Sequence, residues 1–554
     1  MSRQSVQDRN HRTGISRRSF LRYAAAGGLA AAAPIELTRR AEPVRAAVPR
    51  IPPFELEEMT MAEMQRWMAA GRFTARYLVE RYIERVEALD WEGPATRNVL
   101  ELNPDALEIA ERLDTERRSK GPRGPLHGIP VIVKDNIDTA DKMMTTAGSY
   151  ALLGSRAKRD AFLVERLRAA GAIILGKANL SEWANFRGSH SSSGWSGRGG
   201  QGKNPYVLDR NPCGSSSGSG ASVSANYCAG AVGTETNGSI LCPSSANSVV
   251  GIKPTVGLVS RSGIIPIAHS QDTAGPMART VADAAALLSA MTGIDDRDPA
   301  TRESRGHVQP DYTRFLDPDG LRGARIGLPR ERYFGFSEEA DRLMEEAIQA
   351  LRDAGAEIID PADIPNAGEI NRPSYQVLLY EFKADLNKYL AGLGPSAPVK
   401  TLEEIIAFNE AHRDLELKYF GQEQMLRAQE KGPLTEQEYL ESLEQAKRLA
   451  GPEGIDAVME EHQLDALAAP TGSPPWPIDL VNGDNYMGGS SSPAAIAGYP
   501  NISVPAGCVF GLPVGISFFG RAWSEPALIR IAYAFEQATQ LRRPPRFLLT
   551  ADLS

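Results

Sequence analysis

The sequence predicts an α/β protein with a layered sheet, because helical patterns and short apolar strands alternate along the chain. Residues 160–179, DAFLVERLRAAGAIILGKAN, are typical of a helix, an Ala-Gly break and a strand at 172–176. The same order returns at 342–360 in RLMEEAIQALRDAGAEIID. Hydrophobic residues make up 42% and charged residues 23%, as in soluble globular proteins, and 554 residues suffice for one large core or two to four ordinary ones.

The N-terminal half begins with a helical pattern over about residues 55–87, where Thr60 suits an N-cap and Gly71 a C-cap. The stretch GIPVIVKDN (128–136) predicts a short buried strand that ends in a loop. Residues 188–220 are rich in Gly and Ser, as a linker would be. Because Trp195 and Tyr206 interrupt this stretch, we interpret it as a structured active-site loop.

The C-terminal half opens with a mostly helical, charged region at about 337–461, which predicts a helical insertion on the α/β core. Short strands broken by Gly and Pro return at 498–520, and a last helix is expected at 524–539. We therefore expect residues 48–554 to form a single domain that carries this insertion.

The first 47 residues predict an export signal. Arg17 and Arg18 precede Phe-Leu and an Ala-rich stretch, and the small residues Ala46 and Ala47 suit a signal peptidase. The pattern resembles a twin-arginine signal, which implies a periplasmic or secreted protein; the alternative is a basic tail with an Ala-rich helix. No run of eighteen apolar residues follows, so no stable membrane insertion is expected. The net charge of −8 argues against a nucleic-acid partner.

The four cysteines, Cys213, Cys228, Cys242 and Cys508, are too few for a disulfide framework in a chain of this length. No C-x-x-C spacing and no cluster of metal ligands is present. We expect the cysteines to be small buried apolar residues.

Three known catalytic or binding motifs can be compared directly with the residues of this chain. GSSSG at 214–218 fits the G-x-S-x-G nucleophile elbow with Ser216 at its centre, but the preceding KNPYVLDRNPC is no buried strand. A phosphate-binding loop is excluded, because no lysine stands where the motif G-x-x-x-x-G-K-[S/T] needs one. A Ser-His-Asp enzyme would need His127, His190 or His269, and each is more typical of a structural or surface histidine.

Lysine is the alternative base for a serine nucleophile, provided that burial keeps it neutral. Lys134 ends an apolar strand, which suits that role. On local sequence alone, a strand-end lysine that reaches the surface is the better interpretation.

Three long blocks change that interpretation. GIPVIVKDNIDTADKMMTTAGS, the block from NPCGSSSGSG through TETNGSILCP to TVADAA, and AGYPNISVPAGCVFGLPVGISFFG resemble the amidase signature family. The resemblance covers nearly all of the chain from about residue 55. NLSEWANFRG, SSGWSGRGGQ and TETNGSILCP are most similar to its branch of bacterial peptide amidases.

The resemblance implies one large mixed sheet flanked by helices, and a Ser–Ser–Lys triad that needs no metal or other cofactor. Carried over, the nucleophile is Ser239, the bridging serine, which follows a cis peptide bond in the family, is Ser215, and the base is Lys134. The separation between the two serines matches that of the family. The oxyanion hole is expected from the backbone N–H groups of Thr236, Asn237 and Gly238, since pre-set donors there stabilise the tetrahedral intermediate.

Some positions depart from the family. Its common Asp-x-Gly-Gly-Ser reads Glu235-Thr-Asn-Gly-Ser239 here, and the Asn237 side chain would narrow the pocket. For substrate binding we expect Met143 and Met144 to line the acyl pocket and Ser216 to shape the serine-rich loop. Asp135 and Asn136 are expected to hold Lys134, and Asp272 to make a structural hydrogen bond.

The sequence thus predicts an exported amidohydrolase that cleaves a carboxamide to an acid and ammonia. Peptide C-terminal amides are the first choice of substrate, followed by aliphatic, aryl or fatty amides. The family core also occurs in a tRNA-dependent amidotransferase subunit, against which the export signal and the helical insertion argue. An alternative from another class is a non-catalytic amide-binding protein of the same fold.

Overall fold

The computed structural model describes residues 51–395 and 397–553, which fall in one compact unit. The predicted export segment lies outside the described residues. The predictions of one domain at 48–554 and of an insertion at 337–461 stay predictions.

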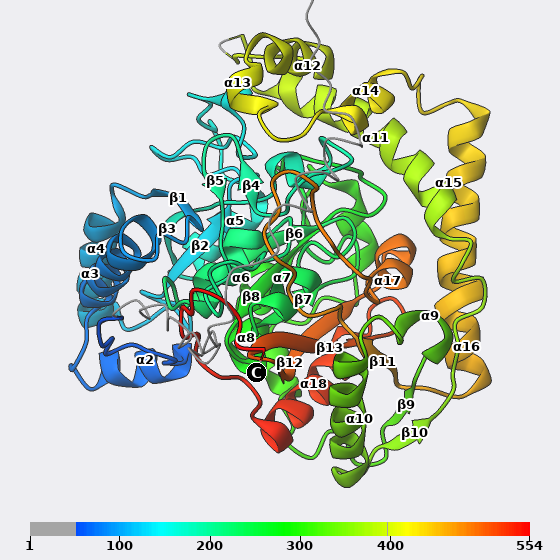
Figure 1. Cartoon of the computed structure of the whole chain (residues 1–554). Helices are drawn as coiled ribbons and strands as arrows, with labels where there is room; N and C mark the ends of the chain where they lie inside the picture. Colours follow the sequence, from blue (N-terminus) through cyan, green and yellow to red (C-terminus); the bar gives the residue numbers. More distant parts are fainter. Residues whose placement is uncertain (1–50, 396, 554) are drawn as a thin grey trace, which may run out of the picture. The chain divides into compact units, whose positions relative to one another are not determined.

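An eleven-stranded mixed sheet forms the centre of the fold (Figure 1). The strand order is β1-β3-β2-β6-β8-β7-β12-β13-β11-β9-β10. The strands are β1 Val99–Leu102, β2 Pro130–Lys134, β3 Ile173–Ala178, β6 Gly230–Glu235, β7 Val250–Lys253, β8 Thr273–Ala278, β9 Arg325–Gly327, β10 Glu357–Ile359, β11 Ala466–Pro470, β12 Asn501–Val509 and β13 Leu512–Phe519. β2 pairs in parallel with β3 and β6, whereas β6 pairs antiparallel with β8. The large mixed sheet expected from the family is therefore present.

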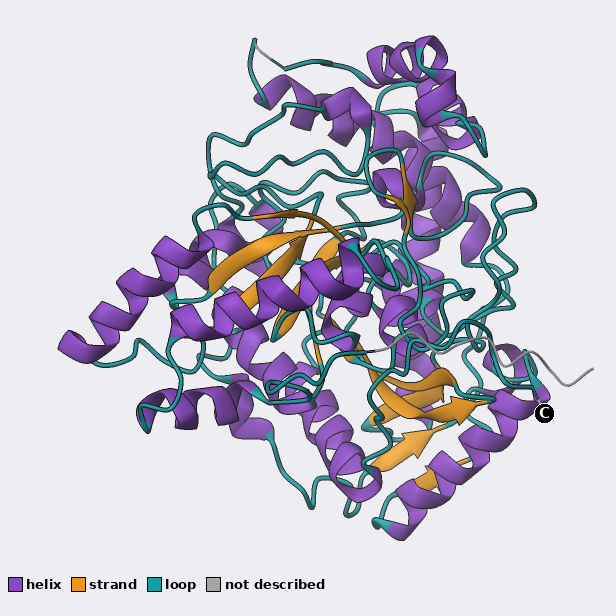
Figure 2. Cartoon of the chain, turned by 60° about the vertical axis from the view of Figure 1, so that its left-hand side comes forward, coloured by secondary structure: helices purple, strands orange, loops and turns teal. Residues whose placement is uncertain are grey.

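Helices cover both faces of this sheet (Figure 2). They are α2 Met61–Ala69, α3 Ala75–Val86, α4 Ala106–Lys120, α5 Phe162–Ala169, α6 Ser217–Ser224, α7 Leu241–Ala246, α8 Val281–Met291, α9 Arg330–Tyr333, α10 Glu338–Asp353, α11 Asn371–Gly392, α12 Leu402–Ala411, α13 Arg413–Glu416, α14 Glu423–Gln429, α15 Gln437–Ala450, α16 Asp456–Glu461, α17 Ser492–Ala497 and α18 Glu525–Thr539. On β6, a Cβ at Gly230 would meet Leu287 of α8, and one at Gly233 would meet Ser216 at the start of α6. Because strand side chains alternate, α6 and α8 lie on opposite faces.

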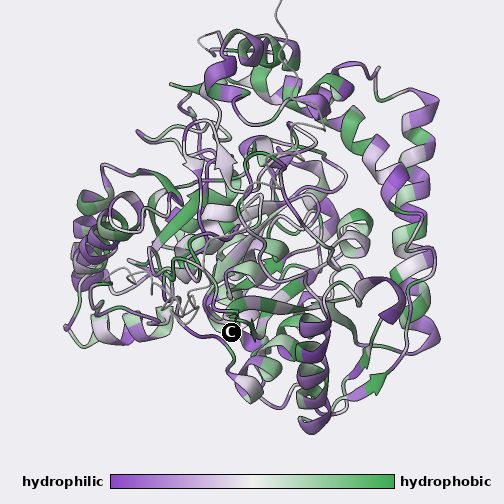
Figure 3. Cartoon of the chain, viewed as in Figure 1, coloured by the Kyte–Doolittle hydropathy of each residue, from purple (hydrophilic) through white to green (hydrophobic). Residues whose placement is uncertain are grey.

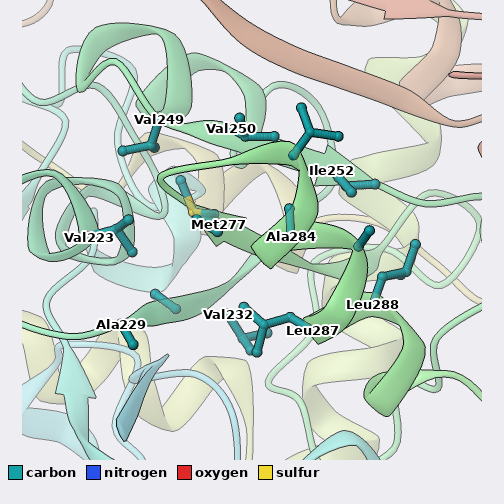
Figure 4. Close-up of a cluster of buried hydrophobic side chains, with 14 of the residues drawn as sticks. Val223, Ala229, Val232, Val249, Val250, Ile252, Met277, Ala284, Leu287 and Leu288 are labelled. Carbon is teal, nitrogen blue, oxygen red and sulfur yellow. The ribbon is translucent and has the colours of Figure 1, made fainter. Parts of the chain in front are cut away.

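Burial on both faces explains why the central strands are apolar throughout. Every residue of β2, β3 and β6 is buried. Figure 3 shows hydrophobic residues along the central strands, and Figure 4 shows Leu287 of α8 beside Val232 of β6 in this core.

Local sequence sets the helix ends where we expected them. Thr60 caps α2 and forms a capping box with Glu63, and Gly71, with φ +70°, follows the last helical turn. The predicted helix and strand at 160–179 are α5 and β3. The Gly/Ser-rich stretch at 188–220 is structured, since it holds the hairpin of β4 (Trp195–Ser196) and β5 (Gly200–Gln201) and the start of α6.

Residues 337–461 contribute to the main hydrophobic core and to a second, separate one. α10 packs on the main core, and β10 joins the edge of the sheet. α11, α12 and α14 enclose a second hydrophobic core with residues 147–152 and 183–186 of the N-terminal half. In Figure 1 these helices lie above the end of the sheet that carries β2 and β6. Among the described residues, no helix is long and apolar enough to cross a membrane.

Candidate active site

Lys134 ends β2 with a fully buried side chain. Its Nζ donates to Ser215 Oγ at 2.7 Å and to Thr234 Oγ1 at 2.8 Å. Burial lowers the pKa of Lys134 to about 7, and the charges of Asp272 and Glu235 offset only part of that effect. Lys134 is therefore a lysine that can lose its proton near neutral pH, which a base must do.

Ser215 contacts this lysine, and its neighbour Ser216 is hydrogen-bonded to Ser239. The Ser215 side chain is fully buried, and the peptide bond from Gly214 to Ser215 is cis, as the resemblance implied. Its carbonyl accepts a hydrogen bond from the Ser181 N–H at 3.1 Å. The Ser215 hydroxyl can thus donate to another oxygen while its own oxygen faces Lys134.

Ser239 follows β6 at the start of the turn into α7. Gly238, directly before it, has φ +78°, a conformation that favours glycine. The Ser239 carbonyl accepts from the Ser216 N–H at 3.1 Å, which joins the loop of Ser239 to the residue after Ser215. Ser239 is 8% exposed whereas Ser215 and Lys134 are at 0%, so Ser239 is the member of the three that solvent and substrate reach.

The loop from Thr236 to Gly238 is held by its side chains and carbonyls. Thr236 Oγ1 donates to Asp272 Oδ1 at 2.5 Å, and the Thr236 carbonyl accepts from Gln271 Nε2 at 3.2 Å. Within the described part of the chain, no hydrogen bond uses the backbone N–H of Thr236 or Asn237. The Gly238 N–H, by contrast, donates to the Glu235 carboxylate. The oxyanion hole expected from the N–H groups of Thr236, Asn237 and Gly238 stays a prediction.

Asn237, the departure from the family pattern, points its side chain toward the start of α17. Its Oδ1 accepts from Ser491 Oγ at 2.8 Å, and its Nδ2 donates to Ser492 Oγ at 3.2 Å. The side chain is exposed, and these bonds tie the loop at 236–238 to the start of α17.

The residues after Lys134 support it in different ways. Asn136 Nδ2 donates to Thr234 Oγ1 at 3.0 Å, and thereby orients a partner of Lys134. Asp135 accepts instead from the Gly148 N–H at 3.2 Å and from Arg198 at 3.4 Å. Asn136 thus acts on Lys134 through Thr234, and no hydrogen bond of the Asp135 carboxylate to Lys134 is present among the described contacts.

The three residues predicted for substrate binding are not brought together. Met143 is fully buried in the main core, and Met144 is half-buried with its sulfur facing the Gly154 N–H. Ser216 is buried, and its Oγ bonds to the carbonyl and the N–H of Thr234. Ser216 thus fastens the serine-rich loop to β6; a role for any of the three in substrate binding stays a prediction.

The cysteine prediction was wrong for three of the four residues. Cys213 and Cys242 form a disulfide with Cα atoms 5.9 Å apart. Cys213 lies two residues before Ser215 and Cys242 three after Ser239, so the bond links the loops that carry these two serines, and Trp476 packs against it. Cys508 is exposed, and Cys228 is buried as expected. The positions of the cysteines beside Ser215 and Ser239 were the signal that could have revealed this pair.

Removing this disulfide is expected to destabilise the enzyme by about 2–4 kcal/mol, because it closes a separation of 29 residues. The Cys213→Ser/Cys242→Ser variant should therefore melt at a lower temperature than the parent. Cys508→Ser is the matched control and should melt like the parent. Equal melting of all three proteins, or free thiols at Cys213 and Cys242 by mass spectrometry, would contradict the assignment.

The three histidines considered as catalytic candidates occupy structural or surface positions. His127 is buried with Nε2 2.9 Å from the Leu113 carbonyl, and His190 is exposed. His269 Nδ1 lies 2.8 Å from Asp385 Oδ2 of α11. No described contact joins any of them to Ser239.

Only one group of possible metal ligands occurs among the described residues: His269, Glu381 and Asp385. Both ring nitrogens of His269 already face these carboxylates, and Asp385 raises the pKa of His269. Lys447 donates to the neighbouring Ser270 carbonyl at 2.7 Å, which adds positive charge close by. The group is best explained as an ion pair that docks the 261–272 loop on α11.

A cavity of about 1050 Å³ opens beside β6. Thr234 and Thr236 line it at the end of β6, and Tyr389 and Lys388 line it from α11. No periodic or motif signal predicted this wall, because α11 lies more than 130 positions after β6 in the chain.

Known proteins that are similar to this chain include amidases. The family model described as Amidase matches residues 77–529. A "Probable amidase" of Arabidopsis thaliana is 46% identical over 504 residues, which cover 89% of this chain and 93% of the plant protein.

Solved structures of peptide amidase are also similar. The peptide amidase in complex with the competitive inhibitor chymostatin is 54% identical with a TM-score of 0.87. The native peptide amidase from Stenotrophomonas maltophilia is 53% identical with a TM-score of 0.86. Each match covers 89% of this chain and 100% of the other.

Proposed function

This chain belongs to the amidase family and is an amide-hydrolysing enzyme, and from that premise we propose that it is an exported amidohydrolase acting on peptide C-terminal amides. It cleaves a linear carboxamide to a carboxylate and ammonia through an acyl-enzyme on a Ser–Ser–Lys triad. The observation that carries the triad is the 2.7 Å contact between the buried Lys134 Nζ and Ser215 Oγ.

In the proposed first half-reaction, Ser239 Oγ attacks the amide carbonyl carbon. The Ser239 proton passes to Ser215 Oγ while the Ser215 proton passes to neutral Lys134 Nζ. The N–H groups of Thr236 and Asn237 stabilise the oxyanion of the tetrahedral intermediate. When the C–N bond breaks, the proton returns through Ser215 to the nitrogen, and ammonia leaves.

The second half-reaction uses the same residues in reverse order. A water molecule attacks the Ser239 ester, and its proton passes through Ser215 to Lys134. Collapse of the second intermediate releases the carboxylic acid and returns the proton to Ser239. The net reaction consumes one amide and one water.

Peptide amides are the proposed substrates because the compared structures are peptide amidases and because the cavity beside β6 has the volume for a short peptide. Aliphatic, aryl and fatty amides are the alternative. The test is ammonia release from N-acetylated amino-acid and dipeptide amides, beside acetamide, benzamide and oleamide. Ammonia from the simple amides alone would overturn the substrate and leave the reaction class standing.

The rate is expected to depend on pH through Lys134. Because the base must be neutral and its pKa is about 7, kcat/KM should rise with pH through about 7 and level off above it. Below that pKa the rate should fall about tenfold per pH unit. The measurement is kcat/KM for one peptide amide from pH 5.5 to 9, with melting temperatures as the control for folding. A flat profile down to pH 5.5 would contradict a lysine base.

Export is proposed from Arg17 and Arg18 in the segment outside the described residues. The Cys213–Cys242 disulfide supports it, because disulfides persist in oxidising compartments. Arg17→Lys/Arg18→Lys should move amidase activity from the periplasmic or medium fraction to the cytoplasm. Unchanged fractionation would remove the twin-arginine assignment.

A further inference from the structure

Gln271 is buried beside the loop that follows β6. β6 pairs antiparallel with β8, and this register sets Glu235, the last residue of β6, opposite Thr273, the first residue of β8. In an antiparallel pair, the residues before one strand therefore lie beside those after the other. Gln271 and Asp272 consequently contact Thr236.

The two residues hold Thr236 at different atoms. Asp272 Oδ1 accepts from Thr236 Oγ1 at 2.5 Å, and Gln271 Nε2 donates to the Thr236 carbonyl at 3.2 Å. A carbonyl oxygen can only accept, so the side-chain amide of Gln271 must turn its nitrogen toward it. Because Gln271 is 2% exposed, water has little access to compete for this carbonyl.

A residue of α11 fixes the other end of the Gln271 amide. Ser374 Oγ donates to Gln271 Oε1 at 2.8 Å, and both residues are buried. Ser374 lies near the start of α11, 103 positions after Gln271 in the chain. The oxygen and the nitrogen of this amide therefore each have a partner. Through Ser374, the helical region at 337–461 supports the loop that follows β6.

The contact at the Thr236 carbonyl also sets the direction of the next N–H. In a trans peptide bond, the C=O and the N–H lie in one plane and point in opposite directions. The bond between Thr236 and Asn237 is trans, so a carbonyl that faces Gln271 turns the Asn237 N–H away from Gln271. No hydrogen bond of the described residues uses that N–H, and Ser491 holds the Asn237 side chain. The peptide is thus fixed on both sides and keeps a donor for a ligand.

We propose that Gln271 is a positioning residue for the reaction: it holds the peptide between Thr236 and Asn237 so that the Asn237 N–H faces the oxygen of the reacting carbonyl. Ser374 acts through Gln271. The inference rests on the proposed function, in which this N–H stabilises the oxyanion. Hydrogen-bonded groups in a row polarise one another, so the bond from Gln271 also strengthens the Asn237 N–H as a donor. A donor set in advance need not reorganise when charge develops on the oxygen.

Gln271→Met tests this role, because it keeps a side chain of similar length and removes the donor. For the amide that the parent hydrolyses fastest, such as Ac-Ala-Leu-NH₂, we expect kcat to fall by about 10- to 100-fold, as for a slightly misplaced catalytic group. KM should change little, since the lost contact is made in the transition state. Ser374→Ala should lower kcat by less. Adding it to Gln271→Met should cause no further loss, because both changes act on one contact.

Gln422→Met is the matched control for the loss of a buried glutamine. Gln422 is 3% exposed, its Nε2 donates to the Ile406 carbonyl at 3.2 Å, and its Oε1 accepts from Asn409 at 3.0 Å. The same kinds of hydrogen bond are therefore lost, but far along the chain from the loop that follows β6. Gln422→Met should melt at a lower temperature than the parent and keep the parent's kcat and KM.

Two inhibitors separate positioning from general damage. Ac-Ala-leucinal reacts with Ser239: its carbonyl carbon bonds to Oγ, the Ser239 proton passes through Ser215 to Lys134, and the former aldehyde oxygen takes the place of the oxyanion. Ac-Ala-leucinol has no carbonyl carbon at that position and cannot form the adduct. Gln271→Met should weaken inhibition by the aldehyde by the same factor as kcat/KM and leave inhibition by the alcohol unchanged.

A parallel loss of kcat/KM and of aldehyde inhibition in Gln271→Met, absent from Gln422→Met, would support the inference. An unchanged kcat in Gln271→Met, or a lower kcat with undiminished aldehyde inhibition, would overturn it while Ser239→Ala is inactive. If Gln271→Met does not fold, Ser374→Ala must show the parallel loss, and its absence overturns the inference. No hydrolysis of any amide by the parent, or undiminished hydrolysis by Ser239→Ala, would overturn the proposed function and this inference with it.

Discussion

Ser239→Ala is expected to lower kcat for a peptide amide by about 10⁴-fold or more, because removing a nucleophile leaves only binding and oxyanion stabilisation. The same variant should not react with a fluorophosphonate, which labels the parent at Ser239. Its fold should persist, since no described hydrogen bond of the Ser239 side chain is lost. The measurements are ammonia release and the labelled mass of the intact protein.

Ser216→Ala is the control that separates the two serine motifs. Ser216 is the centre of GSSSG, and its Oγ bonds to Thr234 of β6. Because that role is structural, Ser216→Ala should still be labelled at Ser239, with a reduced rate at most. Loss of labelling in Ser216→Ala together with labelling of Ser239→Ala would show that the elbow motif, which we rejected, carries the nucleophile.

Lys134→Met is the second change with a large expected effect. It removes the base and keeps the volume and apolar character of a buried side chain. We expect kcat to fall by about 10²–10⁴-fold, the contribution typical of a positioned general base. Lys134→Arg should be equally inactive, because a guanidinium stays protonated and cannot accept the Ser215 proton.

Lys177→Met is the matched control for this change. Lys177 is also fully buried, on the neighbouring strand β3, but its Nζ donates to the Ile137 carbonyl at 2.6 Å and to Thr145 at 3.0 Å. We expect Lys177→Met to be less stable yet to keep most of its kcat. A Lys134→Met enzyme within tenfold of the parent at neutral pH would contradict the base assignment.

Stability gives a readout of Lys134 that does not depend on turnover. Its folded-state pKa of about 7 lies below the ordinary lysine value, so the folded protein binds fewer protons than the unfolded chain between those values. The parent should therefore gain stability relative to Lys134→Met as pH rises from 7 to 9, by up to about 1.4 kcal/mol per pH unit. Melting temperatures of both proteins at pH 7 and 9 test this sign.

Local patterns in the sequence were enough for many elements of the fold. Apolar runs of strand length predicted β2 and β3, and the capping pattern at Thr60 predicted the start of α2. These features depend on neighbouring residues in the chain, so they can be read directly. The family and the large mixed sheet were predicted from three long blocks that resemble the amidase signature family. Blocks of this length reflect constraints of the tertiary structure, which one short motif does not.

The burial and the pKa of Lys134 could not be predicted from the local sequence. From its own segment, a strand-end lysine at the surface was the better interpretation. Its burial depends on α6 and β6, and its partners Ser215 and Thr234 lie 81 and 100 positions away. The same holds for Asn237, whose partner Ser491 is 254 positions away. A pKa near 7 arises only when these segments exclude water together.

The sequence by itself determined the reaction class, the three catalytic residues proposed for it, and the short-range elements that carry them. The tertiary structure decided which side chains surround those residues: the Cys213–Cys242 bond between the catalytic loops, the serine partners of Asn237, and the wall of α11 with Lys388. The physical reason is that hydrogen bonds, desolvation and cavity walls depend on distance in space. Residues far apart in the chain create them, and no local pattern records which of those residues will meet.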